Sequence, residues 1–322
     1  MALTSRARSR CIPSVALGLT VAVTLGLGVA APAFAGHEAS TRRSCPDGTQ
    51  SVYETPAPSA GGGFLLDDGA YRTFSRADAV SGSPTDINNR GDIIGNYSDT
   101  TGAQHGFRID RRGCFRLVDY PGGPRSLNEA IGVNDRRQVI GTWGDYGDER
   151  TNTEAHGYVR SKGRFSSIDV PGALVASAFK NNNRGQVVGS YSNEARARIG
   201  VADAHGFLLD GGRLTRIDAP GAAKTLLVDI NDRGQILGVG MSADNTTGFG
   251  FVRDARGRYT RLPNVPGSLG TSPLGFNNRD QIVGFSIDEA GAVHGYLLDR
   301  GRFETIDVPG FTNTMAWGIN DS

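Results

Sequence analysis

The chain repeats one pattern six times at intervals of about 45 residues. An aromatic residue preceded by His-Gly, or by a close equivalent, recurs at separations of 43, 51, 49, 44 and 45 residues. About 25 residues after each marker begins a segment of the form Asn-Asx-Arg-Gly-Gln-Ile-Ile-Gly, and the sixth copy stops at its start. This period is typical of four-stranded propeller blades, and no helical apolar pattern accompanies it. The aromatic markers are Phe64, Phe107, Tyr158, Phe207, Phe251 and Tyr296.

One unit contains four short strand patterns separated by turn residues. In the fourth unit they cover residues 205–210, 213–217, 224–230 and 235–240, each bounded by Gly, Pro or Asx. The last two are joined by Asn231–Gly234, which suits a tight hairpin whose final residue is left-handed, a conformation that Gly adopts readily. Because Arg137 stands at that final position in the second unit, we expect a distorted hairpin there.

Two columns of mainly apolar residues recur in the third strand pattern, as stacked blades need for a continuous core. We expect Trp317, a member of the first column, to be a core residue rather than a ligand platform. The first column holds Thr85, Ile131, Phe179, Val228, Leu274 and Trp317, and the second, two residues later, holds Ile87, Val133, Asn181, Ile230, Phe276 and Ile319.

The sixth unit lacks the strand that follows these columns, because the chain ends at Ser322. Residues 49–54 have strand-like alternation and lie just before the first marker. Since a closed ring removes an exposed sheet edge, we expect an all-β, six-bladed propeller of four-stranded blades, closed by residues 49–54. The alternative is that the missing strand lies beyond Ser322.

The repeat resembles the HAF-repeat family of extracellular bacterial proteins, named for a His-Ala-Phe opening and an Ile-Asn-x-x-Gly-Gln-x-x-Gly segment. Residues 105–107, 156–158, 205–207 and 294–296 give the opening as His-Gly-Phe or His-Gly-Tyr, and residues 230–238 match the second segment. Residues 62–64 and 249–251 depart from the opening. The resemblance covers residues 62–322 and implies a secreted, propeller-like protein without a defined activity.

The first 35 residues have the three parts of a secretory signal peptide: a basic start, an apolar stretch over residues 15–29 and a small-residue cleavage site ending at Ala35. An uncleaved membrane anchor is the alternative. We expect cleavage after Ala35, a short N-terminal segment over residues 36–48, and a secreted propeller over residues 49–322. Cleavage removes three arginines and no acidic residue, so the formal charge falls from +1 to −2.

A mature chain so close to neutral has no overall field that would draw it to nucleic acid or anionic membranes. No basic cluster stands out along the sequence, so we expect no nucleic-acid partner and no membrane anchor after cleavage. We expect a monomer without cofactors. Cys45 and Cys114 remain after cleavage, and export permits a disulfide between them, although their spacing neither favours nor excludes it.

Four histidines share one repeat position, but blades set such equivalents too far apart for a shared metal ion. We expect each histidine to be hydrogen-bonded within its own unit, and no metal site. The Asn-Asx pairs are better explained by turn formation than by calcium, because they lack the alternating carboxylates of a calcium loop. The four are His105, His156, His205 and His294.

Positions where the repeat is broken are the better candidates for function. Between the two columns, three units carry a charged residue where the others carry Gly. Asp86, Lys180 and Asp229 could line a ligand pocket at the axis, with Lys180 paired to Asp229, or they could form a solvated wall or a structural ion pair.

Two neighbouring units also have long segments after the fourth strand pattern, residues 144–155 and 192–204. Loops on a rigid scaffold often carry binding function, so these are candidates for partner recognition, although tolerated insertions remain an alternative. The candidate residues are Trp143, Asp145, Tyr146, Asp148, Glu149, Glu194, Arg196 and Arg198.

No catalytic motif is present, so an enzyme is not favoured. Two functions stay open at this point. The first is a secreted binding module for a protein or glycan partner. The second is a polysaccharide hydrolase or lyase in which Asp86 and Asp229 converge at the axis.

Overall fold

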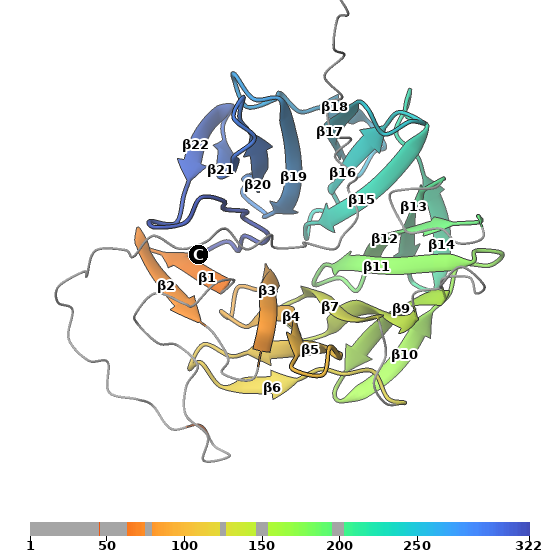
Figure 1. Ribbon diagram of the computed structural model, residues 1–322. Helices are drawn as coiled ribbons and strands as arrows, with labels where there is room; N and C mark the ends of the chain where they lie inside the picture. The colour runs from red at the N-terminus through yellow and green to blue at the C-terminus, as the bar shows by residue number, and fades with distance from the viewer. Residues whose placement is uncertain (1–44, 46–62, 75–78, 123–126, 146–153, 195–202) are drawn as a thin grey trace, which may run out of the picture.

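The computed structural model describes residue 45 and residues 63–74, 79–122, 127–145, 154–194 and 203–322. The described residues form antiparallel sheets and no helix. The expected signal peptide and residues 49–54 lie outside the described residues. Figure 1 shows the sheets arranged side by side around a central axis.

Five four-stranded meanders follow one another along the chain, each with its first strand nearest the axis. A single parallel residue pair, Val175 with Ala155, joins the second and third. The five are β3 (Ala79–Ile87), β4 (Ile93–Asp99), β5 (Gln104–Ile109) and β6 (Phe115–Leu117); β7 (Leu127–Val133), β8 (Val139–Asp145), β9 (Glu154–Ser161) and β10 (Arg164–Ile168); β11 (Val175–Asn181), β12 (Val187–Ser192), β13 (His205–Asp210) and β14 (Arg213–Ile217); β15 (Lys224–Ile230), β16 (Ile236–Met241), β17 (Gly248–Arg253) and β18 (Tyr259–Arg261); and β19 (Gly270–Phe276), β20 (Ile282–Ile287), β21 (Val293–Asp299) and β22 (Arg302–Ile306).

A two-stranded hairpin, β1 (Gly63–Asp67) with β2 (Ala70–Phe74), precedes them. The C-terminal segment returns to the first meander next to this hairpin (Figure 1). Asn320 Nδ2 donates to the Asn88 carbonyl oxygen at 3.2 Å, and Asp321 N donates to Asn89 Oδ1 at 2.6 Å. The two ends of the repeat therefore meet.

The two recurring segments of each unit, the aromatic marker and the Asn-Asx segment, pack on each other. The marker ring lies over the glycine in the second strand, and a Cβ atom at Gly189 would lie 2.7 Å from the Phe207 ring and 2.1 Å from the Ser177 carbonyl oxygen. Glycine is therefore required by close approach at this position. The same contact recurs as Phe107 on Gly95, Tyr158 on Gly141, Phe251 on Gly238 and Tyr296 on Gly284.

The core lies between consecutive meanders, as the apolar columns predict. One cluster joins Ile140 and Ile168 of the second meander to Ala178 and Phe207 of the third. A similar cluster joins Ile94 of the first to Ala130 and Tyr158 of the second. Trp317 is half-buried.

The first apolar column has a second role. In each of the five meanders the register of the first strand shifts at this residue, which forms a β-bulge. Bulges re-aim the side chains that follow them. The residue after the bulge is the one that is charged in three units: Asp86, Lys180 and Asp229.

The hairpin at Arg137 is not distorted, which corrects the expectation from the sequence. Arg137 takes the left-handed conformation, with φ at 60°. Its N–H donates to the Asn134 carbonyl oxygen at 2.9 Å, the same bond that Gly234 makes to Asn231. Its guanidinium Nε bonds the buried carboxylate of Asp92 at 2.8 Å, so the unusual residue has a specific partner.

Candidate functional site

The two ends of the sheets differ in the connections that they carry. Because the strands of each meander are antiparallel, all Asn-Asx turns between first and second strands lie at one end of the sheets, which we call the Asn face. The opposite end, which we call the link face, carries the connections between second and third strands. It also carries the links between meanders, most of which read Asp-x-Pro-Gly. The hairpins between third and fourth strands also lie on the Asn face.

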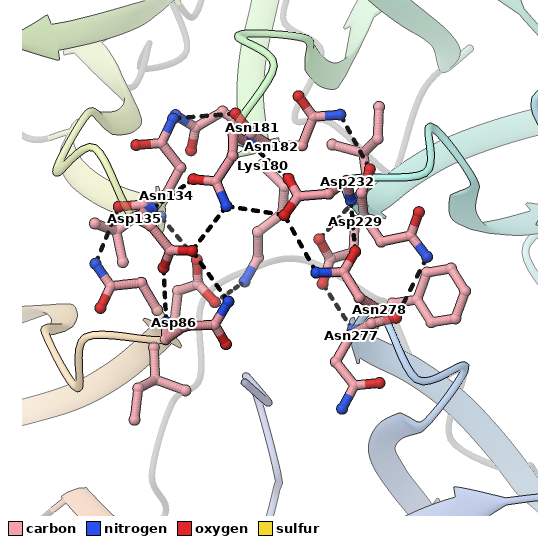
Figure 2. Close-up of a pocket in the computed structure, with 18 residues that line it drawn as sticks. Asp86, Asn134, Asp135, Lys180, Asn181, Asn182, Asp229, Asp232, Asn277 and Asn278 are labelled. Atoms are coloured by element: carbon pink, nitrogen blue, oxygen red, sulfur yellow. Dashed lines mark hydrogen bonds and ion pairs between the residues drawn. The ribbon is translucent and has the colours of Figure 1, made fainter. Parts of the chain in front are cut away.

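Asp86, Lys180 and Asp229 come together at the axis below the Asn face, from β3, β11 and β15 (Figure 2). Lys180 Nζ lies 2.6 Å from Asp86 Oδ1, and both side chains are almost fully buried. The sequence suggested Asp229 as the partner of Lys180, so the structure corrects this pairing. Lys180 can pair with Asp86, two meanders back, because both side chains extend into the axis (Figure 2).

Both carboxylates also bind backbone N–H groups of the following meander. Asp86 Oδ2 accepts from Val133 N at 2.7 Å, and Asp229 Oδ2 accepts from Phe276 N at 2.7 Å. The pKa of Asp229 is raised to about 6. Burial is the largest cause, the Lys180 ammonium group partly offsets it, and the Asp86 carboxylate raises the pKa as well. These contacts fix one meander against the next, which is the structural ion-pair alternative of the sequence analysis.

A ring of asparagines surrounds the axis above these charges. Each first Asn of an Asn-Asx pair donates from Nδ2 to the backbone carbonyl of the next, and the last donates to the first. In five of these turns its Oδ1 also accepts two N–H groups, as Asn231 does from Arg233 and Gln235, whereas Asn320 Oδ1 accepts one. Turn formation therefore occupies these side chains, as the sequence indicated. The ring runs through Asn88, Asn134, Asn182, Asn231, Asn277 and Asn320.

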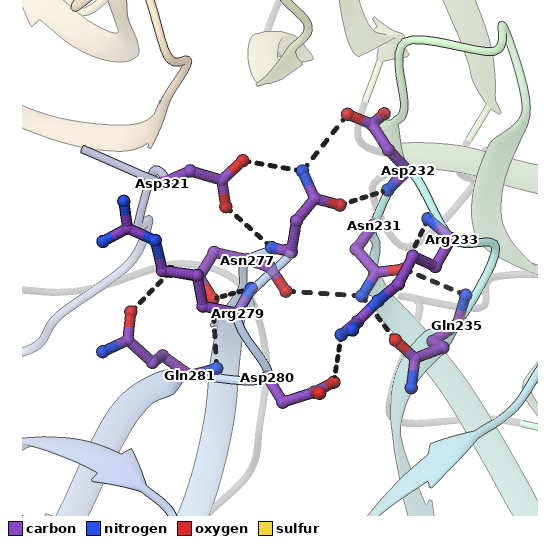
Figure 3. A network of polar contacts seen from close by, with 10 residues as sticks. Asn231, Asp232, Arg233, Gln235, Asn277, Arg279, Asp280, Gln281 and Asp321 are labelled. Carbon is purple, nitrogen blue, oxygen red and sulfur yellow. Dashed lines mark hydrogen bonds and ion pairs between the residues drawn. The ribbon is translucent and has the colours of Figure 1, made fainter.

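The second residues of the pairs form another ring, in which Asn and Asp alternate. Asn183 Nδ2 donates to Asp135 Oδ2 and to Asp232 Oδ2, both at 2.8 Å. Asn278 Nδ2 likewise donates to Asp232 and Asp321, the two carboxylates that are labelled in Figure 3. The alternation satisfies both residue types, because each Asn amide donates its two hydrogens to the two Asp carboxylates beside it, and carboxylates only accept. The remaining member, Asn89, bonds Asp135 and Asp321 in the same way.

The pocket that these rings and charges line is small. Its volume is about 70 Å³. Pockets for drug-sized ligands have about 300–1,000 Å³, whereas a water molecule needs about 10–15 Å³ of such space. The pocket therefore has room for a few water molecules and not for a sugar residue.

Asn181 also lines this pocket, although the sequence did not single it out as a candidate site residue. Asn181 occupies the second column, where the other units carry an apolar residue, and this break in the column was its signal. Its Nδ2 donates to the Gln138 carbonyl oxygen at 3.2 Å, while its buried Oδ1 has no hydrogen-bond partner among the described residues. A water in the pocket could satisfy this oxygen.

The four repeated histidines lie at the link face, and each bonds an aspartate of the following Asp-x-Pro-Gly link. The Nδ1 distances are 2.8 Å from His105 to Asp119 and 2.9 Å from His294 to Asp307. His156 bonds Asp169 at 2.8 Å and His205 bonds Asp218 at 3.2 Å. The expected hydrogen-bonded role is confirmed.

The candidate recognition residues are only partly described. Trp143 and Asp145 belong to β8 rather than to a protruding loop, which corrects their assignment. The Trp143 ring stacks on Tyr120 at 4.3 Å and on His156 at 4.7 Å between centroids, so it already has two aromatic neighbours. Glu194 is exposed. Tyr146, Asp148, Glu149, Arg196 and Arg198 lie outside the described residues.

Three of the exposed large apolar side chains lie on the link face, each after a different link between meanders. Leu174 is 45% exposed and Leu269 is 72% exposed, and both follow a Pro-Gly link directly before a first strand. Phe311 follows the last such link and is 37% exposed. These residues therefore lie at the end of the sheets opposite the asparagine rings.

Cys45 and Cys114 form a disulfide with a Cα–Cα distance of 5.6 Å. Cys114 lies in the hairpin between β5 and β6, so the bond ties the N-terminal segment to the Asn face of the first meander.

No protein-family model matches the chain, and no curated protein sequence matches it. Among solved structures, TolB from Acinetobacter baumannii is 15% identical with a TM-score of 0.51, over 73% of this chain and 55% of TolB. The chain thus spans about half of that protein's length. A putative TolB from Agrobacterium tumefaciens matches with the same identity and TM-score, over 73% of this chain and 83% of its own. These likenesses establish an all-β, propeller-like fold and nothing about activity.

Among the described residues, no group of three or more His, Cys, Asp or Glu side chains could hold a metal ion. The described part of the chain contains no helix that is long and apolar enough to cross a membrane.

Proposed function

We propose that the chain is a closed six-bladed propeller of the HAF-repeat type. Support comes from the two rings of hydrogen bonds, which run through six turns and return to the first. Residues 313–319 would then be the first strand of a sixth blade and β1 and β2 its third and fourth, with residues 49–54 as the second.

The strand assignment can be tested by truncation. In a Cys114→Ser background, a chain beginning at residue 55 should have a clearly lower melting temperature than one beginning at residue 49. Equal melting temperatures would contradict the assignment of residues 49–54, because both chains lack the disulfide and differ only in that strand.

We also propose that the protein is a secreted, monomeric binding module, and that its link face binds a protein partner. The observation that carries this proposal is that Leu174, Leu269 and Phe311, which follow three different links on that face, are exposed apolar side chains. Apolar side chains that stay exposed on a folded protein often belong to a surface that binds another protein. Acidic residues of the same face, such as Asp169 and Asp307, would form a polar rim.

A protein partner fits this face better than a glycan. Sugars stack on aromatic faces, but Tyr97 and Tyr191 are buried and the Trp143 ring already stacks on Tyr120 and His156. A hydrolase or lyase at the axis is also disfavoured, because the pocket is too small for a sugar and its carboxylates bind backbone N–H groups. Substituting Asp86 and Asp229 by Ala and screening polysaccharides for turnover would test that alternative.

The binding proposal is tested with a matched pair of variants. Wild-type protein on a solid support should retain a protein from the culture fluid or envelope of its source cells, and Leu174→Asp with Leu269→Asp should abolish this. Leu117→Asp is the control, since Leu117 is 49% exposed on the outermost strand β6. Deleting residues 146–153 tests the contribution of the long loop separately. Equal capture by wild type and the double variant would refute the link-face assignment.

A further inference from the structure

The Asn face carries a circle of arginines that the sequence disperses. In five of the six Asn-Asx turns the third residue is Arg, and consecutive copies are 46 to 49 residues apart along the chain. All five side chains are exposed. Because the turns surround the axis, the fold brings their guanidinium groups to one end of the molecule. They are Arg90, Arg136, Arg184, Arg233 and Arg279.

A second, outer set of cations lies on the same face. The hairpins between third and fourth strands contribute Arg112, Lys162, Arg213, Arg256 and Arg300, all of them exposed. Each meander therefore presents one cation near the axis and another at the rim. Among the described link-face connections no comparable set occurs, because their charged residues are all Asp or Glu.

Many acidic groups of the Asn face are already used by hydrogen bonds or ion pairs. Asp135, Asp232 and Asp321 accept the amide hydrogens of the alternating ring. Asp92 is buried against Arg137, and Asp280 bonds Arg233. Arg90, Arg136 and Arg279, by contrast, form no ion pair among the described residues. In the described part of the chain, the connections of the Asn face thus carry an excess of basic side chains and those of the link face an excess of acidic ones, even though the whole chain is close to neutral.

We propose that the Asn face binds an acidic polysaccharide, a polymer that carries carboxylate or sulfate groups along a flexible chain. Guanidinium groups form strong, often bidentate hydrogen bonds with such anions. The arginines lie on a circle around the axis, which a flexible polymer can follow. A stiff nucleic-acid duplex would cross the centre, where the carboxylates of Asp135, Asp232 and Asp321 repel phosphate.

This surface is separate from the link face, so the two proposals can fail independently. It also accounts for the exposed Arg that recurs in five turns. Arg90, Arg136 and Arg279 take part in their turns through the backbone N–H. The Arg184 and Arg233 guanidinium groups also donate, to Gln186 and to Asp280.

The test measures binding of the wild-type protein to polygalacturonate, dextran sulfate, neutral dextran and duplex DNA at low salt. We expect binding to at least one acidic polysaccharide, none to neutral dextran, and weakening by tenfold or more on raising the salt concentration from about 50 to 300 mM, since surface charges are screened within about one Debye length. The triple variant Arg90→Ser, Arg136→Ser and Arg279→Ser should lose affinity by at least about tenfold.

The control is Arg116→Ser, Arg216→Ser and Arg261→Ser, which removes the same charge from exposed positions on outer strands. It should change affinity by less than about threefold, with thermal melting confirming that both variants fold. Failure of both acidic polysaccharides to bind, an equal loss in the control, or tighter binding of DNA through the same arginines would overturn the proposal. Loss of protein capture on the link face would leave it intact.

Discussion

Lys180 and Asp86 form an ion pair at the axis, with 2.6 Å between Nζ and Oδ1, although 94 positions separate them in the chain. Both side chains are almost fully buried. Asp229 shares this environment, so one ammonium group faces two carboxylates. The pair links the first and third meanders directly, across the axis rather than through the sheet between them.

Removing the lysine should therefore destabilise the fold strongly. Lys180→Met leaves Asp86 without its cation, which costs about 3–5 kcal/mol when a buried pair is broken. Chemical denaturation measures the loss. The double variant Lys180→Met with Asp86→Asn should recover part of it, and a double variant no more stable than the single one would contradict the ion-pair account.

The stability of the protein should also depend on Asp229. Its pKa in the folded protein is about 6, above the ordinary value, because burial disfavours the charged form. A raised pKa means that the stabilising contribution is present below the unfolded pKa of about 4 and is lost as the pH rises through 6. Wild type should lose on the order of 2 kcal/mol relative to Asp229→Asn between pH 4 and pH 7, as denaturation at several pH values would reveal. A constant difference would argue against a raised pKa.

The alternating ring predicts that Asn183 cannot become Asp. Asn183→Asp replaces two amide donors with a third carboxylate between Asp135 and Asp232, so repulsion adds to the lost hydrogen bonds. We expect Asn183→Asp to destabilise the fold by about 1–3 kcal/mol, and by more than Asn183→Ala, in thermal or chemical unfolding at pH 7. The gap between the two variants should narrow in high salt. The reverse order would exclude a role for charge.

Asp92 and Arg137 should be replaceable only together. Arg137→Gly relieves the left-handed backbone but leaves the buried Asp92 carboxylate without its cation, so we expect a net loss of about 1–3 kcal/mol. Adding Asp92→Gln restores the Asn-x-x-Gly-Gln pattern of the other units and should return stability to near wild type. Additive losses in this double-mutant cycle would show that the two residues act independently.

His294 should titrate above its ordinary pKa. The hydrogen bond that its ring donates to Asp307, and then the one that it donates to Asp288, stabilise the protonated form and raise the pKa of His294. NMR titration should show this, and Asp307→Asn should lower the value. Because the folded pKa is raised, the stabilisation is complete below the unfolded pKa of about 6.5 and is lost as the pH rises through the folded one. A lower pKa in wild type than in Asp307→Asn would contradict the pairing.

Local patterns predicted much of the strand layout because they report local physics. In the fourth unit, β13, β14 and β15 have the bounds that alternation and turn residues indicated. The Asn-Asx turns and the histidines were also interpreted correctly, since their partners lie within one unit or follow from the repeat. The undistorted hairpin at Arg137 was missed, because its guanidinium partner Asp92 lies in a different meander.

The sequence by itself determined that this chain builds one strand meander after another, because period, turn chemistry and apolar columns all act over a few residues. Only the tertiary structure decided what meets at the axis and at the two faces. It paired Lys180 with Asp86 instead of Asp229, and it gathered arginines spaced by almost fifty residues into one circle. The physical reason is that the interaction of two charges depends on the distance between them in space. The positions of two turns along the chain do not give that distance.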